Sequence, residues 1–318
     1  MNESNSGNLS KGDIISFVAL LVLGVSVFFG MNFMTLGNKI PSIVVAVLLF
    51  FLMIVFVFLA AHAKAQNRNQ DKWRIVEYVM LVLYMIALIP CYIYSSKFFD
   101  IQFGKQEITK VVQSDIDDIN RMFADYTEKC ESRCSNFQTE LEALFKSDEG
   151  KVRIVKLLDL DKQPEQVTMG DIEQATESFR DFHFKARNIS RIISEKNQLI
   201  ENCDKNFKNW NILFIPQYVS ELGEAKTKYA EALEQVYTEN KSPLENDIPE
   251  FDADTYINES NIIGQFTSLS GFSVWGLVAI VVLGGLGLVK YLFGEKPDII
   301  PLASGDETNI TDEGGFIF

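Results

Sequence analysis

Four long apolar runs constrain this chain more than any other feature of its sequence. Each run has about 20 residues, enough to cross a hydrocarbon core of roughly 30 Å as a helix that rises about 1.5 Å per residue. The four runs are Ile14–Phe33, Ile43–Ala61, Ile75–Tyr94 and Phe272–Phe293. Lipid offers the backbone no hydrogen-bond partners, so an isolated apolar run can span it only as an α-helix. We therefore predict four membrane-spanning helices.

A cleaved signal peptide is the alternative interpretation of the first run. Signal peptides have a shorter apolar core, followed by a cleavage site of small residues of the A-x-A type. Ile14–Phe33 is longer than such a core, and no A-x-A-like site follows it. We interpret this run as an uncleaved anchor.

Basic residues near the ends of the runs predict their orientation, because Lys and Arg are enriched in cytoplasmic loops. The loop between the second and third runs contains Lys64, Arg68, Lys72 and Arg74. This bias predicts that both chain ends and this loop lie in the cytoplasm. We expect a plasma membrane of the bacterial inner-membrane type, an assignment that the charge pattern itself does not supply. The expected segments are a cytoplasmic tail at 1–13, three spans within 14–94, an extracytoplasmic domain at 95–271, a fourth span at 272–293 and an acidic cytoplasmic tail at 294–318. Because long domains can cross a membrane regardless of flanking charge, the reverse orientation is the alternative.

The predicted spans carry no Asp, Glu, Lys, Arg or His at mid-depth, and Glu77 lies near the start of the third run. Proton pumps and ion-coupled transporters usually need an ionisable group buried among their helices. The sequence therefore disfavours both of these classes.

Three glycines in the fourth run, Gly276, Gly284 and Gly287, fall near one helical face. Small residues let two helices approach closely in lipid. The glycines therefore predict close packing, either against other spans of this chain or against another subunit.

Apolar residues recur at helical spacing after the third run and predict a long helix from about 105 to about 160. The stripe consists of Ile108, Val112, Ile116, Ile119, Phe123, Tyr126, Cys130, Phe137, Leu141 and Leu144. Gly150 lies inside the pattern. One glycine costs about 1 kcal/mol in a helix, so we expect at most a local break there.

A second helix is predicted after a turn around Pro164, because Thr168 and Asp171 have the spacing of a capping box. Its apolar residues alternate at steps of three and four, which indicates a heptad seam interrupted only by Lys196. The seam consists of Ile172, Ala175, Phe179, Phe182, Ala186, Ile189, Ile193, Ile200, Cys203, Phe207 and Trp210. We therefore predict that the two helices pair as a long antiparallel coiled-coil hairpin.

A third helix is predicted from Pro216 to about Asn240, packed against the lower half of the hairpin. The segment 241–271 is rich in acidic residues and has the composition of an extended linker into the fourth span. The predicted fold is therefore all-α, with four spans and a helical hairpin plus a third helix between spans three and four.

The positions of the cysteines suggest a disulfide. In a hairpin that turns near residue 165, residues whose numbers total about 330 face each other, which brings Cys130 close to the level of Cys203, with Cys134 as the alternative partner. An extracytoplasmic compartment permits disulfides. Our hypothesis is a Cys130–Cys203 disulfide, and the alternative is reduced cysteines that fill small core positions.

The sequence offers little material for catalysis. It lacks the phosphate-binding, dinucleotide-binding, zinc-protease and nucleophile-elbow motifs. His62 and His183 have no evident catalytic partner, and the run of Asp115, Asp117 and Asp118 is typical of a solvated helix face. A net charge of −14 disfavours nucleic acid, because phosphate binding needs a basic surface. We expect no enzymatic activity, no metal site and no cofactor.

A rigid helical rod on four membrane helices fixes a distance and presents surface. These features predict a non-enzymatic, membrane-anchored scaffold component of a multi-protein envelope assembly, such as a secretion or transport apparatus. The expected partners are membrane lipid, other subunits of that assembly and further copies of the chain. The alternatives are a transmembrane sensor that acts through a separate effector, and a channel-forming subunit.

Overall fold

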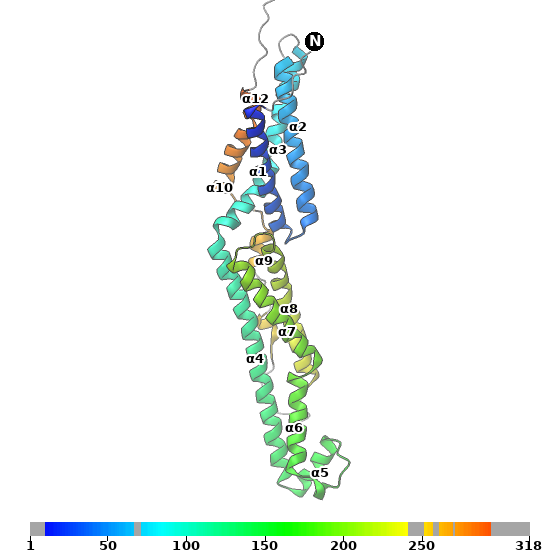
Figure 1. Ribbon diagram of the computed structural model, residues 1–318. Coiled ribbons are helices and arrows are strands. Elements are labelled where there is room, and N and C mark those ends of the chain that lie inside the picture. Colours follow the sequence, from blue (N-terminus) through cyan, green and yellow to red (C-terminus); the bar gives the residue numbers. More distant parts are fainter. Residues whose placement is uncertain (1–9, 67–70, 241–250, 257–260, 270, 294–318) are drawn as a thin grey trace, which may run out of the picture.

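The chain folds into an elongated molecule with its apolar helices gathered at one end and a helical rod extending from them (Figure 1). The computed structural model describes residues 10–66, 71–240, 251–256, 261–269 and 271–293. Every regular element in these residues is helical, which confirms the all-α prediction. Four helices are long and apolar enough to cross a membrane, as the sequence predicts.

The first three of these helices pack against one another. They are α1 (Lys11–Met34), α2 (Lys39–Gln66) and α3 (Asp71–Phe103), and each is longer than the apolar run that predicted it. A capping box between Ser10 and Asp13 starts α1, and a tight turn with Gly37 at φ 89° separates α1 from α2. Many of their apolar side chains remain exposed on the outer faces, as expected of surfaces that contact lipid.

The fourth span is a helix of changing type. It consists of α10 (Val274–Ala279), the π-helical turn η3 (Ile280–Gly284), α11 (Gly285–Gly287) and α12 (Val289–Phe293). Its segments pack against α1 and α3, and α12 also contacts α2. The fourth span therefore closes a bundle with the other three.

The rod begins without a true interruption of the third span. α4 (Lys105–Phe145) follows α3 after Gly104 alone, and helical hydrogen bonds continue through this residue. With 41 residues, α4 is about 60 Å long. Its predicted apolar stripe is buried from Ile108 to Leu141.

The first arm ends earlier than predicted. The helix stops at Phe145, and a separate helix, α5 (Asp148–Leu157), packs beside its end at the tip of the rod (Figure 1). The Ser147 hydroxyl caps α5 by accepting a hydrogen bond from the Gly150 backbone N–H at 3.0 Å. A side chain at Gly150 would collide with the Leu144 carbonyl group. The serine cap and this close contact explain why the chain changes direction here, although the apolar pattern continues.

The returning arm consists of a short 3₁₀ turn, η1 (Pro164–Gln166), and two helices, α6 (Met169–Phe184) and α7 (Arg187–Lys208). The predicted capping box starts α6, where the Thr168 N–H donates to an Asp171 carboxylate oxygen at 2.9 Å. The break between α6 and α7 shifts the buried face. Phe182 and Ile193 of the predicted seam are 59% and 39% exposed, while the neighbouring His183 and Ile192 are buried. The single unbroken seam is therefore wrong at these positions.

The third predicted helix is α8 (Ile215–Glu239), which packs against α4 and α7. The prediction of an extended linker is wrong in part. Two elements, η2 (Ala253–Tyr256) and α9 (Asn261–Thr267), pack against α4 and α8. Ile262 and Phe266 of α9 are fully buried. They join the same core as the buried residues of α4, α7 and α8. Residues 241–250 of the predicted linker lie outside the described residues.

Candidate functional site at the junction of membrane helices and rod

The glycines of the fourth span lie against other helices of the same chain. A Cβ atom on Gly276 would lie 2.7 Å from the Ser96 Cα atom of α3, and one on Gly284 would lie 3.0 Å from Leu88 of α3. A Cβ on Gly287 would crowd the Tyr84 hydroxyl of α3 and Leu20 of α1. Within the chain, these three glycines therefore lie close to α1 and α3.

A buried tyrosine marks the change of helix type in the fourth span. The Tyr84 hydroxyl, on a side chain that is 1% exposed, donates to the Gly284 carbonyl at 2.7 Å. Below this point the Leu288 N–H bonds to the Gly285 carbonyl, one residue nearer than in an α-helix. The hydroxyl therefore supplies a donor to a backbone carbonyl where the regular helical ladder changes.

A buried lysine of α3 holds the end of α9, which we call the rod base. The Lys97 side chain is 4% exposed and donates to the carbonyls of Gln265 and Ser268 at the end of α9. A cation favours the C-terminal end of a helix because the last carbonyls there are unpaired. Lys97 therefore fixes α9 on α3.

The end of the fourth span that lies nearer the rod is also held by α3. The Ser273 hydroxyl donates to Asp100 at 2.6 Å, and the Ser273 N–H donates to the Tyr92 hydroxyl at 3.2 Å. The same serine oxygen accepts a hydrogen bond from the Gly276 N–H and so caps α10. Together with Lys97, this serine makes α3 the common support of the rod base and the fourth span.

The opposite ends of the spans are joined by a second polar cluster. The Lys64 ammonium donates to the Tyr291 carbonyl at 2.6 Å and the Leu292 carbonyl at 3.3 Å, so it pairs with the end of α12. Lys290 forms an ion pair with Asp13 at 2.6 Å. Of the other residues that predict topology, Lys72 and Arg74 are exposed, and Arg68 lies outside the described residues. Lys64 thus has a structural contact that charge counting does not reveal.

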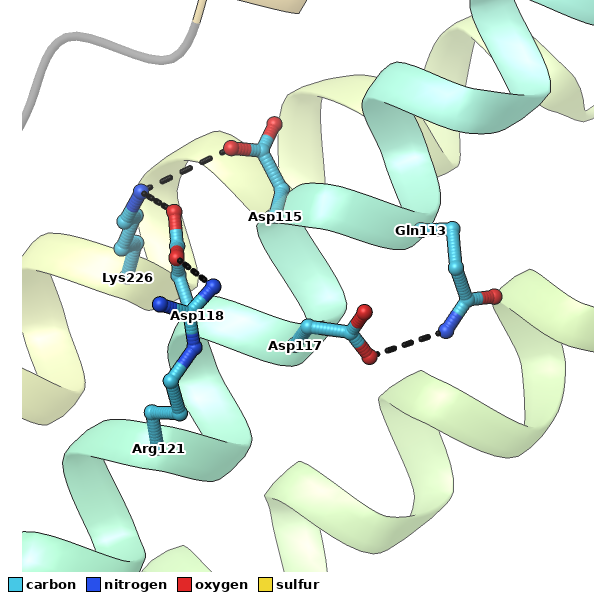
Figure 2. A network of polar contacts seen from close by, with 6 residues as sticks. All are labelled: Gln113, Asp115, Asp117, Asp118, Arg121 and Lys226. Atoms are coloured by element: carbon cyan, nitrogen blue, oxygen red, sulfur yellow. Dashed lines mark hydrogen bonds and ion pairs between the residues drawn. The ribbon is translucent and has the colours of Figure 1, made fainter.

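A buried ion pair joins α4 to α8 within the rod (Figure 2). The Lys226 ammonium lies 3.0 Å from an Asp118 carboxylate oxygen and 3.5 Å from Asp115, and its side chain is 5% exposed. Arg121 pairs with Asp118 from the other side at 3.0 Å. Asp117 points away and accepts a hydrogen bond from Gln113 at 3.1 Å. The interpretation of all three aspartates as a solvated face is therefore wrong for Asp115 and Asp118.

The register of the rod separates the cysteines that we expected to pair. Contacts across the rod join Gln102 with Trp210, Asn120 with Lys196 and Phe137 with Phe179, whose numbers total 312 to 316 instead of 330. The total is lower because residues 146–168 lie outside the pairing of the arms. Cys203 is therefore level with about residue 112, roughly 27 Å along α4 from Cys130.

A disulfide needs Cα atoms within about 7 Å of each other. A Cys130–Cys203 disulfide is therefore incompatible with this register, and Cys134 is farther still from Cys203. All four cysteines are buried free thiols. Burial raises the pKa of Cys130 and Cys203 to about 12 and that of Cys134 to about 11, so the folded chain keeps these thiols protonated and poorly reactive.

A buried histidine lies where α6 ends. The His183 side chain is fully buried, and its ring lies 5.0 Å from that of Phe179. Neither ring nitrogen makes a well-formed hydrogen bond with the described residues. Arg133 lies close by and donates to the carbonyls of Tyr237 and Asn240 at the end of α8. Burial, with a smaller contribution from the Arg133 charge, lowers the pKa of His183 to about 4.

We expect His183 to make the rod sensitive to acid. Its pKa is about 4 when folded and about 6.5 when unfolded, so the folded state favours the neutral ring. The contribution to stability is complete above pH 6.5 and is lost as the pH falls from 6.5 to 4, by about 3 kcal/mol. Urea unfolding of the rod at several pH values should show a shallower pH dependence for His183→Phe.

The other histidine provides the control for this experiment. His62 is exposed near the end of α2 and lies outside the rod, so His62→Gln is the matched control for the removal of a histidine. An identical pH dependence for His183→Phe and the native chain would contradict the prediction.

The described surface of the rod also has a groove of about 430 Å³ between α4 and α6. Its lining includes Glu173, Glu177, Arg180, Asp181 and Lys185. These side chains are charged and exposed, and Asp181 pairs with Lys185 at 2.9 Å. In the part of the chain that the structure describes, no three His, Cys, Asp or Glu residues come together in a way that could hold a metal ion. Deeply buried polar side chains, such as Lys97 and Lys226, instead join one helix to another.

Comparison of the chain with protein-family models, with characterised proteins and with solved structures finds no match.

Proposed function

We propose that this chain is a non-enzymatic, membrane-anchored scaffold whose rod holds its tip at a fixed height above the membrane. The observation that supports this most is the passage of α3 into α4 through Gly104 alone, with helical hydrogen bonds on both sides. A rod joined in this way to a span inherits its direction from the membrane bundle. The Lys226 ion pair and the buried aromatic residues add fixed contacts along its length.

The location and partners belong to the same proposal. The basic loop residues favour a cytoplasmic position for both chain ends and an extracytoplasmic rod. The proposed membrane is of the bacterial inner-membrane type. The tip would then meet other subunits of an envelope assembly, for which a secretion or transport apparatus is the proposed class. Further copies of the chain are also proposed partners.

A sensor is the second candidate, because one contact favours it. Ser273, at the start of the fourth span, bonds to Asp100 just below the rod base. A ligand or partner that displaced the rod would therefore act directly on the outer end of the fourth span. The output would still require a separate effector protein.

Orientation is tested by labelling introduced cysteines in intact cells with a membrane-impermeant maleimide. Gln163 at the tip and Gln66 at the end of α2 are both exposed, while the native cysteines are buried. We expect Gln163→Cys to react in intact cells and Gln66→Cys to react only after permeabilisation. The reverse pattern would place the rod in the cytoplasm and overturn the proposed orientation.

Rigidity is tested by the distance between spin labels at Gln106, near the rod base, and Glu173, on α6 near the tip. The register places Glu173 level with about residue 141, so we expect one narrow distribution near 50 Å in the full-length chain in lipid nanodiscs. A broad distribution, or several distances, would show a flexible domain and contradict the spacer function.

A further inference from the structure

Large apolar side chains remain exposed where the rod meets the membrane helices. We call this set the junction belt, and it consists of Ile40, Phe103, Leu213, Phe214, Phe272 and Trp275. Exposed fractions within it reach 76% for Ile40 and 77% for Phe272. Exposed apolar patches of this kind mark surfaces that contact another phase or another molecule.

Stacked rings join the α3 and α10 sides of the belt. The Phe103 and Trp275 rings stack with centroids 4.7 Å apart, although the two residues remain 59% and 54% exposed. Phe99 stacks on Phe103 in turn, at 6.4 Å. The three rings therefore contact one another in a row, and large parts of Phe103 and Trp275 stay uncovered.

Lysines accompany the rings on the other side. The Lys39 ammonium lies 4.9 Å from the centre of the Phe214 ring, and Lys105 lies 5.1 Å from that of Trp210. Trp210 also donates a hydrogen bond to Gln102 of α3, the residue before Phe103. These contacts bring the two sides of the belt to one level of the molecule.

The fourth span fixes the depth of this level. It extends from Val274 to Phe293, and its 20 residues make about 30 Å, the thickness of a hydrocarbon core. Trp275 is its second residue, so its ring falls at one boundary of that core. Ile40 is the second residue of α2 and lies at the same end of the bundle.

We propose that the junction belt lies in the headgroup layer of the bilayer and sets the angle of the rod to the membrane. Aromatic rings favour this layer because one part of each ring meets acyl chains and another meets water. Lysines there can also meet lipid phosphates. A belt on several sides of the rod base resists tilting in each of those directions. This contact with lipid is independent of the role of the rod as a spacer.

The depth of Trp275 provides the first test. The full-length chain is placed in nanodiscs of phosphatidylcholine brominated either near the glycerol end or at mid-chain, and quenching is compared between the native chain and Trp275→Phe. The emission lost in the variant belongs to Trp275, and we expect shallow bromines to quench it about twice as strongly as deep ones. Trp73→Phe controls for the tryptophan at the opposite membrane face.

Emission from Trp275 that neither lipid quenches would overturn the proposal. Size measurement of the same samples identifies a protein partner. If the native chain is an oligomer and Trp275→Phe is a monomer, the belt is an interface between copies and not a lipid contact.

The angle of the rod provides the second test. A dye at Gln163→Cys reports its height above dyes in the lipid, measured as the spread of single-molecule energy transfer. We expect Phe103→Ser combined with Trp275→Ser to broaden the spread of heights. Phe182→Ser is the matched control, because Phe182 is also 59% exposed but lies on the rod, and it should change nothing. Equal spreads for both variants would overturn the role of the belt in orientation.

Discussion

Replacing Gly276 with leucine should lower the unfolding temperature of the full-length chain in detergent by about 5–10 °C. The reason is the closeness of α10 to α3, since even a Cβ atom at this position would lie 2.7 Å from the Ser96 Cα atom. Backbone cannot move aside as a flexible side chain can. The fourth span must therefore shift, and the shift breaks the cap between Ser273 and the Gly276 N–H.

Gly285 is the matched control, because it lies in the same span and has no atom within 4 Å of a Cβ built on it. Gly285→Leu should leave the unfolding temperature within about 2 °C of the native value, since surface substitutions usually change stability by under about 0.5 kcal/mol. Equal effects of the two variants would mean that helix propensity, and not the approach of α10 to α3, determines the result.

Removing the buried Lys226 ammonium should be the most damaging single change within the rod. In Lys226→Ala, the carboxylates of Asp115 and Asp118 lose the cation that they share (Figure 2). Breaking a buried ion pair from one side costs about 3–5 kcal/mol. The native thiols report this loss, because Cys130 and Cys203 are fully buried and react only when the rod opens. Their labelling rate should rise by a factor between about 10² and about 5 × 10³.

Lys228, two residues farther along the same helix, provides the comparison. It pairs with Glu195 at 2.7 Å, but the two side chains are 59% and 37% exposed. An exposed pair contributes about 0–1 kcal/mol, so Lys228→Ala should change the labelling rate by less than about fivefold. A small effect of Lys226→Ala, similar to that of Lys228→Ala, would show that water reaches the Lys226 site in solution.

The membrane helices were predictable because lipid leaves a chain few choices. Ile43–Ala61 contains no polar side chain, so hydropathy and length alone define this helix. The apolar stripe of α4 was predictable for a related reason. Helical periodicity identifies the residues that face a core, and Ile108 to Leu141 are buried as expected.

The register of the rod was not predictable from periodicity. Apolar spacing continues past Gly150 at the same period, so it does not show that the chain turns back at Ser147. The serine cap is the local signal that identifies this break. The midpoint between the arms moves by several residues as a result, and the level of each cysteine moves with it.

The polar residues of the candidate site were the hardest to interpret. Lys97, Lys226 and His183 are buried, yet each lies in a sequence that resembles a solvated face or an interface. Their partners lie far away in the chain, as for Lys97 and the end of α9. Pairing at such separations depends on tertiary contacts, which a single sequence does not contain.

The single residue between α3 and α4 also gives the rod a mechanical advantage. The far end of α4 lies about 60 Å from Gly104, so a change of only about 10° in the angle between the two helices moves that end by about 10 Å. Conversely, a sideways force on the tip produces a bending moment at Gly104 that grows with the length of the rod, and Gly104 is then the fulcrum of the motion. The contacts of Lys97 and Asp100 lie within two turns of that fulcrum and are therefore where such a load is borne.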